Sequence, residues 1–595
     1  MSRGVSAEHA GAVAGPFGFR VTEQTAVPLT EQTRQLCCAP YVNGEFANQV
    51  IGEVIEDEHR AVAPSFGFDL AAVVRHCYQA RRILLLRNAL LTGLLGAGLG
   101  YVQKPTITLL TVGALMHTVR FVRTRRPSRR QRVFLPVILH HLLGWAPFLV
   151  AALVYFGLPL AGQAGAALRP FTGLSRDDLG GDALLDLASR TGEAVWHLAA
   201  GPVALAVLTL AVLVGYHVIT YRILTSSLAH SEYPVLPPLP NARIARRVAR
   251  VATAQYGNVT VHSADPFLGT GDVVRAWSFA LRLRRHSRDG APGEPVMLDP
   301  LKINDEVRRR LMELGDEDLS HQQRVPGTCL VPHIVADGLR DLDDELVCGR
   351  ERLTFPVAAP ATVDAIIRHP QGGLRHFQRV VVGNVVAGEA DNAVRTDDGR
   401  VVARLRHQEV GVSAFVHLAV EGGLLYVEFV ATVLPPVQHR YHLLDALHGS
   451  AGRQWGRAIG QAWRGWLTDT AAAPWRLGRG VWRVSTGRSR MNRAERASRE
   501  FRRYDYGARL SVRTLAAEPE PVTYLQKLDA EKYVKLIERV TAESVLDHLE
   551  RHHIDTAEFS RRVSVIQDNS IHISGSTFQA ATAIGVTGSV TQLQN

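Results

Sequence analysis

Four long apolar stretches in the first 225 residues constrain the fold most strongly. They cover residues 83–102, 105–122, 133–161 and 194–224. A bilayer core of ~30 Å is crossed by a helix of ~20 apolar residues, because only a helix satisfies its own backbone hydrogen bonds in lipid. The stretches therefore predict an α-helical membrane domain of four transmembrane helices. Arg87 lies near the start of the first stretch, where we expect its side chain to extend to the membrane interface.

The charges of the connecting segments orient these helices. Residues 120–132 hold seven arginines and no acidic residue, whereas residues 163–193 hold five acidic residues and three arginines. Arginine also precedes the first stretch and follows the fourth. Because basic loops stay on the cytoplasmic side, we predict a multi-pass plasma-membrane protein with cytoplasmic N- and C-termini and the lipid bilayer as its partner.

Composition divides the chain into six parts. We predict an N-terminal cytoplasmic region (1–82), the membrane domain (83–224), a cytoplasmic α+β domain (225–436), a basic Trp/Arg segment (437–513), a helical module (514–563) and an uncharged tail (564–595).

The α+β domain contains a clear hairpin pattern. Two strand-like segments, residues 409–420 and 424–434, flank Gly422 and Gly423. Both faces of the alternating pattern are apolar, so we predict a central antiparallel hairpin covered by helices. Residues 301–314 and 361–382 have helical periodicity and predict two such helices.

The basic segment combines arginine with tryptophan. Residues 453–503 contain thirteen arginines and five of the eight tryptophans. On a helix, three arginines fall on one side and three tryptophans on the other. This predicts a helix at the membrane surface, with its arginines near anionic lipids. In the alternative, the tryptophans pack on the protein; nucleic acid, which also suits arginine and aromatics, is not expected so close to a membrane. The residues are Arg453, Trp455, Arg457, Trp463, Arg464 and Trp466.

The tail carries no charged residue after Asp568. High β-propensity without charge or proline is typical of segments that stack into cross-β assemblies. We therefore predict a self-assembly segment around Ile573, Ile584 and Gly585, and with it a homo-oligomer or a protein partner. The alternative is a low-complexity tail or a local β-hairpin.

The residues give few indications of chemistry. The motifs of phosphate-binding loops, zinc proteases and serine hydrolases are absent, so the catalytic residues stay unknown and the protein is not expected to be an enzyme. Asp265, Gly269 and Gly271 form a candidate ligand loop, although their spacing is more typical of a turn between strands. The cluster of His548, His552 and His553 is expected to be a solvated surface, so no metal site is predicted.

Four histidines lie at a similar depth in the apolar stretches and form a candidate intramembrane polar site. They are His117, His140, His141 and His217. Polar groups within a membrane are functional candidates. Paired histidines can ligate haem, but hydrogen bonding between helices is the simpler interpretation, and we predict no cofactor.

Several segments resemble a family of uncharacterised actinobacterial multi-pass membrane proteins. They are residues 59–77, 256–281 and 573–586. The tail also resembles the bacterial amyloid signalling motifs that are related to the RHIM. The resemblance implies location and architecture, not an activity.

The features together favour a plasma-membrane-anchored signalling or scaffold protein with a cytoplasmic α+β domain and a C-terminal self-assembly tail. Two alternatives stay open. One is a membrane redox or transport protein that uses the intramembrane histidines. The other is a membrane-tethered enzyme that acts on a nucleotide or a lipid.

Overall fold

The chain divides into two compact units. Unit 1 comprises Met1–Tyr78, Ser227–Leu444 and Arg488–Asn595; unit 2 comprises Gln79–Ser226 and Asp445–Gly487. The computed structural model describes residues 16–18, 29–65, 67–124, 181–228, 236–285, 293–316, 325, 327–349, 351–370, 373–383, 394–395, 398, 400–403, 410–447, 451–520 and 523–568.

Unit 1 is built on a six-stranded sheet with the order β2-β4-β9-β12-β13-β3. Its strands are β2 (Val259–His262), β3 (Asp272–Arg282), β4 (Cys329–Asp337), β9 (Leu374–Val382), β12 (Gly411–Glu421) and β13 (Leu424–Leu434). Strands β2 and β4 are parallel, and every other neighbouring pair is antiparallel. Chain segments outside the sheet cover the outer edge of β2: Val259 N–H donates to Pro356 O, and Ala508 N–H donates to Val261 O.

The predicted central hairpin is confirmed. Strands β12 and β13 pair without interruption from Gly411 opposite Leu434 to Glu421 opposite Leu424. Gly422 and Gly423 form the turn with φ values of 60° and 75°, a conformation that glycine adopts without the steric cost of a Cβ atom. Side chains on both faces of β12 are buried, as the alternating apolar pattern predicts.

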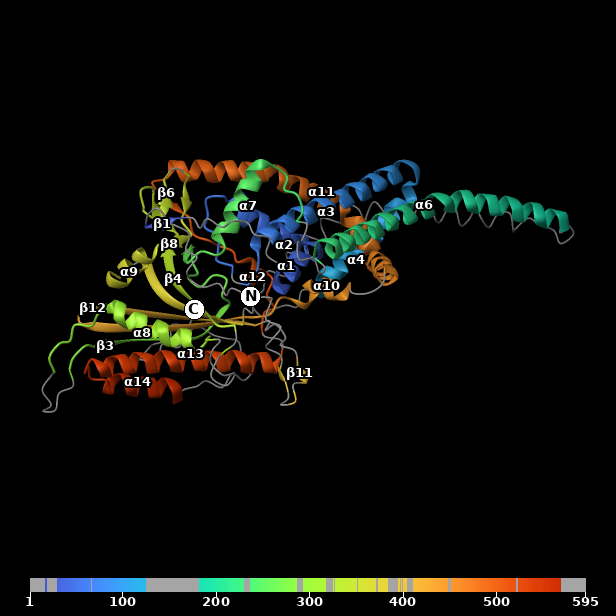
Figure 1. Ribbon diagram of the computed structural model, residues 1–595. Coiled ribbons are helices and arrows are strands. Elements are labelled where there is room, and N and C mark those ends of the chain that lie inside the picture. Colours follow the sequence, from blue (N-terminus) through green and yellow to red (C-terminus); the bar gives the residue numbers. More distant parts are fainter. Residues whose placement is uncertain are drawn as a thin grey trace, which may run out of the picture. The chain divides into compact units, whose positions relative to one another are not determined.

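Helices cover one face of this sheet (Figure 1). They are α8 (Pro300–Glu313), α9 (Pro360–Arg368), α13 (Tyr524–Arg551) and α14 (Ala557–Asp568). Their core includes Val307, Val416, Phe429 and Ile537, all 0–1% exposed. Local chemistry starts the longer helices. The Asp299 side chain accepts from Leu301 N–H to begin α8, and Thr523 with Gln526 forms a capping box on α13.

The predicted single helix over residues 361–382 is wrong. Helix α9 ends at Arg368, and strand β9 starts at Leu374. Pro370 cannot continue a helix, and Gly373 has a φ of 80°, so the chain turns here. The apolar residues that follow belong to a buried strand, not to a second half of the helix.

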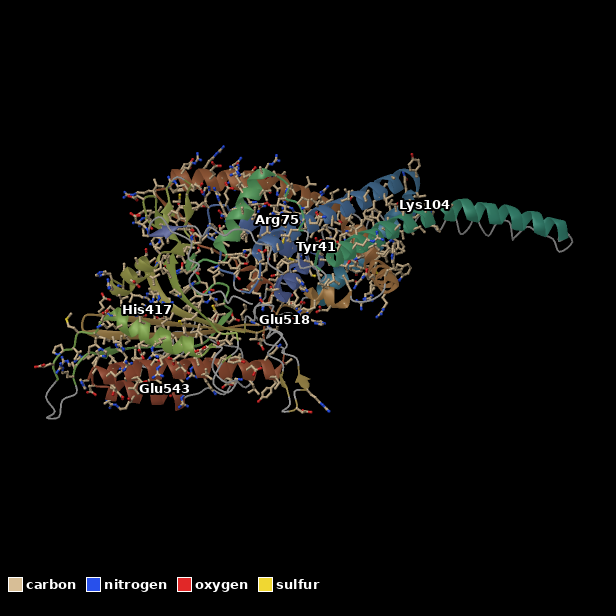
Figure 2. All side chains as sticks on the ribbon, in the orientation of Figure 1. Tyr41, Arg75, Lys104, His417, Glu518 and Glu543 are labelled. Carbon is tan, nitrogen blue, oxygen red and sulfur yellow. The ribbon has the colours of Figure 1, made fainter. Side chains whose placement is uncertain are left out.

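Aromatic side chains pack on the opposite face of the sheet. The Phe267 ring lies 4.7 Å from Phe415 and 6.1 Å from Phe377 between centroids. The Arg379 guanidinium lies 5.2 Å from the centre of the Phe415 ring. On β12, His417 (Figure 2) donates from Nδ1 to the backbone oxygen of His376 at 2.7 Å. This layer fixes the turn between β2 and β3 on the sheet.

Shorter elements complete unit 1. They are α1 (Glu31–Val42), α2 (Gly44–Val50), the π-helix η1 (Ile51–Glu56), α7 (Ala242–Ala254), the 3₁₀ helix η3 (His439–Tyr441), α10 (Leu443–Ala446, which reaches into unit 2), α12 (Val512–Leu515), β1 (Phe17–Gly18), β5 (Leu339–Asp341), β6 (Val347–Cys348), β7 (Leu353–Thr354), β8 (Val357–Ala358), β10 (Val394–Arg395), β11 (Val401–Ala403) and β14 (Arg503–Asp505).

The predicted membrane domain of four transmembrane helices is wrong. Among the described residues, two helices are long and apolar enough to cross a bilayer: Leu70–Tyr101, which is α3, and Ala200–Leu228, the C-terminal part of α6 (Gly181–Leu228). The second apolar stretch lies in α4 (Gln103–Thr124), where Lys104, several threonines and arginines break the apolar run. The third stretch, residues 133–161, lies outside the described residues.

Unit 2 also contains most of α11 (Ala451–Glu500), which packs on α4 and α6. Arg87 of α3 is 6% exposed, and its Nη1 lies 3.7 Å from Asp469 Oδ2 of α11. The expected extension of Arg87 to an interface is therefore wrong, because the side chain is buried against a carboxylate of the same unit.

Gly271 provides a test of the sheet. It has a φ of 93°, and an added Cβ atom would collide with the backbone oxygen of Val433. We expect Gly271→Ala to destabilise unit 1 by roughly 2–4 kcal/mol, because both the backbone and the neighbouring strand would have to move. Thermal unfolding of the purified full chain measures this. Gly349→Ala is the control, since its Cβ atom meets nothing within 4 Å; equal melting temperatures would contradict the expectation.

Candidate functional site: an arginine-lined pocket

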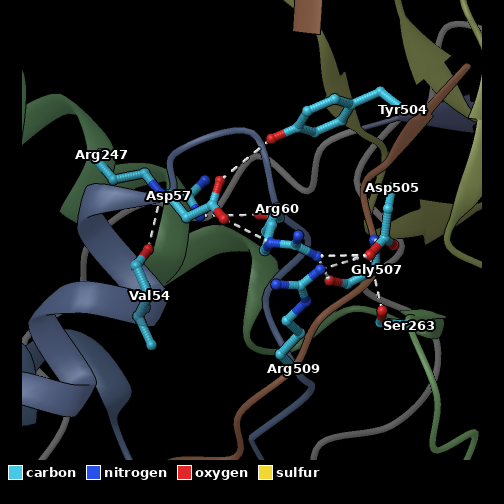
Figure 3. A network of polar contacts seen from close by, with 9 residues as sticks. All are labelled: Val54, Asp57, Arg60, Arg247, Ser263, Tyr504, Asp505, Gly507 and Arg509. Carbon is cyan, nitrogen blue, oxygen red and sulfur yellow. Dashed lines mark hydrogen bonds and ion pairs between the residues drawn. The ribbon is translucent and has the colours of Figure 1, made fainter. Parts of the chain in front are cut away.

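A network of charged groups joins three distant segments of unit 1 (Figure 3). The Asp505 carboxylate accepts from Arg60 Nη1 at 3.0 Å, Arg509 Nη2 at 3.1 Å, Ser263 Oγ at 2.8 Å and Gly507 N–H at 3.0 Å. Arg60 also donates from Nε to Asp57 at 2.6 Å and from Nη1 to the backbone oxygen of Gly507 at 2.9 Å. The network therefore ties the N-terminal region to the turn after β2 and to the segment after β14.

The network holds its carboxylate in the charged form. Burial raises the pKa of Asp505, but hydrogen bonds from Ser263, Arg60 and Gly507 outweigh it and leave the pKa below its ordinary value. Burial and the neighbouring Asp57 carboxylate raise the pKa of Tyr504 to about 12, so this hydroxyl stays protonated at neutral pH. Its OH lies 3.4 Å from Asp57. Each described ionisable group of the network is therefore paired with an opposite charge or a polar donor.

Arg247 of α7 differs from its charged neighbours. It is 4% exposed, and it donates from Nε to the backbone oxygen of Val54 at 3.1 Å and from Nη2 to that of Arg60 at 2.9 Å (Figure 3). Among the described residues, no carboxylate oxygen lies within 4.0 Å of its guanidinium. Burial lowers its pKa to about 10, so the side chain remains positively charged at neutral pH without a carboxylate in contact.

A small pocket with an internal volume of about 20 Å³, room for one or two water molecules, opens beside Arg247. Two more arginines, Arg60 and Arg250, line it, and its remaining walls are mostly apolar. These walls are formed by Ala61, Val62, Ala254, Val259, Val261, Leu353, Thr354, Phe355 and Pro356. Concave sites with apolar walls and a few converging charged groups are the usual form of small-ligand sites, so this pocket is the candidate functional site.

One of the three arginines is held only loosely. Arg250 Nη2 lies 2.9 Å from Glu351 Oε2, and the two side chains are 39% and 44% exposed. Exposed ion pairs of this kind contribute about 0–1 kcal/mol, so the pair can open at low cost. The next residue, Arg352, has a φ of 55°, a strained conformation for a side-chain-bearing residue that is often found at binding sites.

The six residues predicted to meet the membrane surface all lie on the unit 2 part of α11. They are Arg453, Trp455, Arg457, Trp463, Arg464 and Trp466. Five are exposed, and Trp466 is half-buried with its Nε1 donating to Thr209 Oγ1 at 2.9 Å. Trp463 stacks on Trp466 at 5.8 Å between ring centroids and is itself 64% exposed. The structure thus places arginines and tryptophans together on the accessible surface of one helix.

The candidate ligand loop forms a packed turn. Asp265 Oδ1 accepts from Phe267 N–H at 2.9 Å, and Phe267 contacts the aromatic side chains of the sheet. Gly269, with a φ of 91°, lies against Ser511, and Gly271 lies against Val433. Ligand binding by this loop stays a prediction.

The histidines and the tail are described only in part. His117 lies on α4 and His217 on α6, where the His217 ring is 5.1 Å from Tyr216 and 6.0 Å from Tyr221. His140 and His141 lie outside the described residues, as do Ile573, Ile584 and Gly585 of the tail. Their predicted roles stay predictions.

Sequence reasoning missed the arginine-lined pocket. Arg247 lies three residues after Ile244 and one before Val248, on the buried face of α7. An arginine on the apolar face of an amphipathic helix is a signal for a buried charge. The partners could not be found in this way, because Arg60 and the wall around Phe355 come from distant segments.

The fold and the pocket define an α+β protein with a six-stranded mixed sheet and a cationic site. The chain belongs to the AbeC-like domain family. The domain matches residues 276–580, which is about half of the chain. No curated protein and no solved structure matches it. The match includes Glu351 and Asp505, whereas Arg60, Arg247 and Arg250 precede it. The pocket therefore joins the AbeC-like domain to residues outside it.

The Asp505 network predicts a dependence of stability on pH. The folded state holds the pKa of Asp505 below that of the unfolded chain, so its contribution is complete above the unfolded pKa of about 4 and is lost as the pH falls through the folded value. We expect Asp505→Asn to cost roughly 1–3 kcal/mol at pH 7 and to reduce the loss of stability on acidification. Melting temperatures between pH 3 and 7 measure both effects. Asp343→Asn, on an exposed residue, is the control.

Proposed function

We propose that the protein is a membrane-anchored signalling or scaffold protein. In this proposal unit 2 attaches the chain to the membrane, the α+β domain of unit 1 is a binding module, and the C-terminal tail recruits further copies of the chain. The proposal concerns binding instead of catalysis, because the described charged groups around the pocket are held by ion pairs and hydrogen bonds.

The observation that carries the proposal is the exposed apolar surface of unit 2. In the most apolar window of each candidate membrane helix, 28% of the residues are buried. Large apolar side chains are therefore accessible on them, among them Leu86, Leu90, Val203, Val207 and Leu208, which are 49–60% exposed. A helix in the core of a water-soluble protein buries such residues, whereas a helix in lipid exposes them.

Charge supports a cytoplasmic position for unit 1. Arg75, Arg81 and Arg82 precede the apolar part of α3, and Arg222 lies near the end of α6. Along the chain, α3 and α6 connect to unit 1 at the ends that carry these arginines. Because arginine is retained on the cytoplasmic side, this arrangement favours an inward-facing module.

Helix α11 supports contact with the lipid surface. Trp463, Trp475 and Trp482 are 64–71% exposed, and the helix is rich in arginine. Tryptophan favours the interfacial region of a bilayer, and arginine favours anionic head groups. We therefore propose anionic lipids of the inner leaflet as the partners of this helix.

The membrane attachment predicts a specific effect of charge on α6. Val203→Asp together with Val207→Asp introduces two carboxylates on exposed positions, each costing about 2.5–3.5 kcal/mol if it lies at the centre of a bilayer. We expect the share of protein that stays in the membrane fraction after alkaline carbonate washing to fall several-fold. Leu339→Asp, on a residue of unit 1 that is 60% exposed, should leave this share unchanged. A wild-type chain that carbonate extracts fully would contradict membrane insertion.

The proposed assembly through the tail is tested separately. Residues 569–595 carry no charge, and lysine in a stacked segment would place like charges next to each other along the assembly. We expect the fluorescently labelled full chain to form clusters in cells and the Ile573→Lys, Ile584→Lys variant to stay evenly distributed over the membrane. Met297→Lys with Met312→Lys, on two exposed residues of unit 1, is the matched control. Clusters that persist in the tail variant would exclude the tail as the assembly segment.

A further inference from the structure

We propose that the C-terminal tail docks on the six-stranded sheet of its own chain, where residues 571–577 add a seventh strand along the outer edge of β3. The outer edge is the side of β3 that faces away from β13. This docking involves unit 1 alone and goes beyond the proposed function. It requires neither membrane insertion nor assembly of the tail.

The outer edge of β3 is open. Strand β3 is the last in the order of the sheet, and among the described residues no strand pairs with its outer side between positions 276 and 282. Ser278, Ala280 and Arg282 are exposed there. An edge strand presents unpaired N–H and C=O groups, so it is a template on which an extended segment can add a further strand.

The direction of the backbone groups can be followed from the end of β3. Leu283 N–H donates to Gly423 O, on the side of β13. Successive residues of a strand direct their backbone groups to opposite sides, so Arg284 points outwards, where its carbonyl accepts from Asp555 N–H at 2.9 Å. By the same alternation, the even-numbered residues before Arg282 direct their N–H and C=O groups outwards. These residues are Ala276, Ser278 and Ala280.

The segment that leads into the tail already follows this edge. Arg285 forms an antiparallel bridge with Ile554, so helix α14, which begins at Ala557, starts on the outer side of β3. The Phe559 ring lies 5.2 Å from that of Phe279 between centroids, and the Arg562 guanidinium lies 5.9 Å from the centre of the same Phe279 ring. Helix α14 therefore leads from the end of β3 back over its middle.

The starting point and the length of the tail fit the open edge. Asp568, the last residue of α14, lies six residues after Arg562, a distance of ~9 Å along a helix. The 27 residues 569–595 follow directly. Seven extended residues span ~23 Å, which is the length of β3 from position 276 to 282. Two residues, 569 and 570, are enough to connect a helix to a strand.

The sequence of the tail matches the two faces of the edge. Residues 570–574 read Ser-Ile-His-Ile-Ser, an alternation that is typical of a strand with one covered face. On β3, Phe279 and Leu281 are buried in the core under the helices, whereas Ser278 and Ala280 are exposed on the other face. The two isoleucines would extend the apolar face, and the polar residues would extend the exposed face.

Disulfide cross-linking in the purified full chain tests this docking. Cysteine replaces Ser278 and, in separate variants, each of residues 571–577, in a background where the accessible Cys329 and Cys348 are serine. Neighbouring strands lie ~4.8 Å apart, within the Cα separation that a disulfide spans. Because side chains of a strand alternate between its faces, we expect oxidation with copper phenanthroline to link tail positions two residues apart, with yields at least five-fold above those of the positions between them.

A second variant tests the backbone contact. Ala280→Pro removes an outward-facing N–H group, which an edge strand tolerates, and should lower the highest cross-linking yield several-fold. Ala280→Val is the matched control, because it keeps the N–H group and should leave the yield unchanged. The melting temperature of each variant checks that the sheet is retained.

Three results would overturn the docking of the tail on β3. The first is a yield no higher than with Leu339→Cys in place of Ser278→Cys, since Leu339 is an exposed residue elsewhere on unit 1. The second is an even yield along 571–577, which would indicate chance collisions. The third is cross-linking between two chains, seen as a dimer in electrophoresis. Clustering of the labelled chain in cells is a separate measurement, so docking and assembly can each fail or hold alone.

Discussion

The carboxylate of Asp505 is the constraint on which the arrangement of unit 1 depends. It accepts hydrogen bonds from Arg60, Ser263, Gly507 and Arg509, which come from the N-terminal region, the turn after β2 and the segment after β14. These donors stabilise the partly buried carboxylate, and a partly buried donor such as Arg60 would carry a desolvation cost if it lost this partner. The same network positions the Arg60 carbonyl that holds Arg247, so the shape of the pocket follows from how this one charge is satisfied.

The sequence predicted those parts of the fold that local patterns determine. The hairpin of β12 and β13 was predictable because alternating apolar residues flank two glycines, and helix α8 because its periodicity follows Asp299 and Pro300. The strand β9 was not, since an apolar run has no period that separates a buried strand from a helix. The prediction of a four-helix membrane domain was wrong for a similar reason. It rested on the length of the apolar stretches and did not take the polar residues of α4 into account.

The candidate site was less predictable than the fold. Arg60, Arg250 and Glu351 look like ordinary surface charges in the sequence. Arg247 stands out on the apolar face of α7, but the meeting of these residues depends on long-range packing. Arg87 shows the same limit. Its position in an apolar stretch suggested a side chain that extends to an interface, yet Asp469, which lies far along the chain, gives it a buried partner. Which charges meet is a property of tertiary structure that residue spacing does not contain.

The division of unit 1 into three chain segments has a consequence for biosynthesis. Arg60 and Asp505 are 445 residues apart, and the ribosome adds ~5–20 residues per second. The N-terminal region therefore waits roughly 20 to 90 s for the carboxylate that fixes it, while the apolar helices α3 and α6 are already synthesised. Unit 1 can close only after these helices have left the ribosome. Its nascent N-terminal segment, with buried cysteines and apolar side chains still uncovered, is thus a natural client for chaperones.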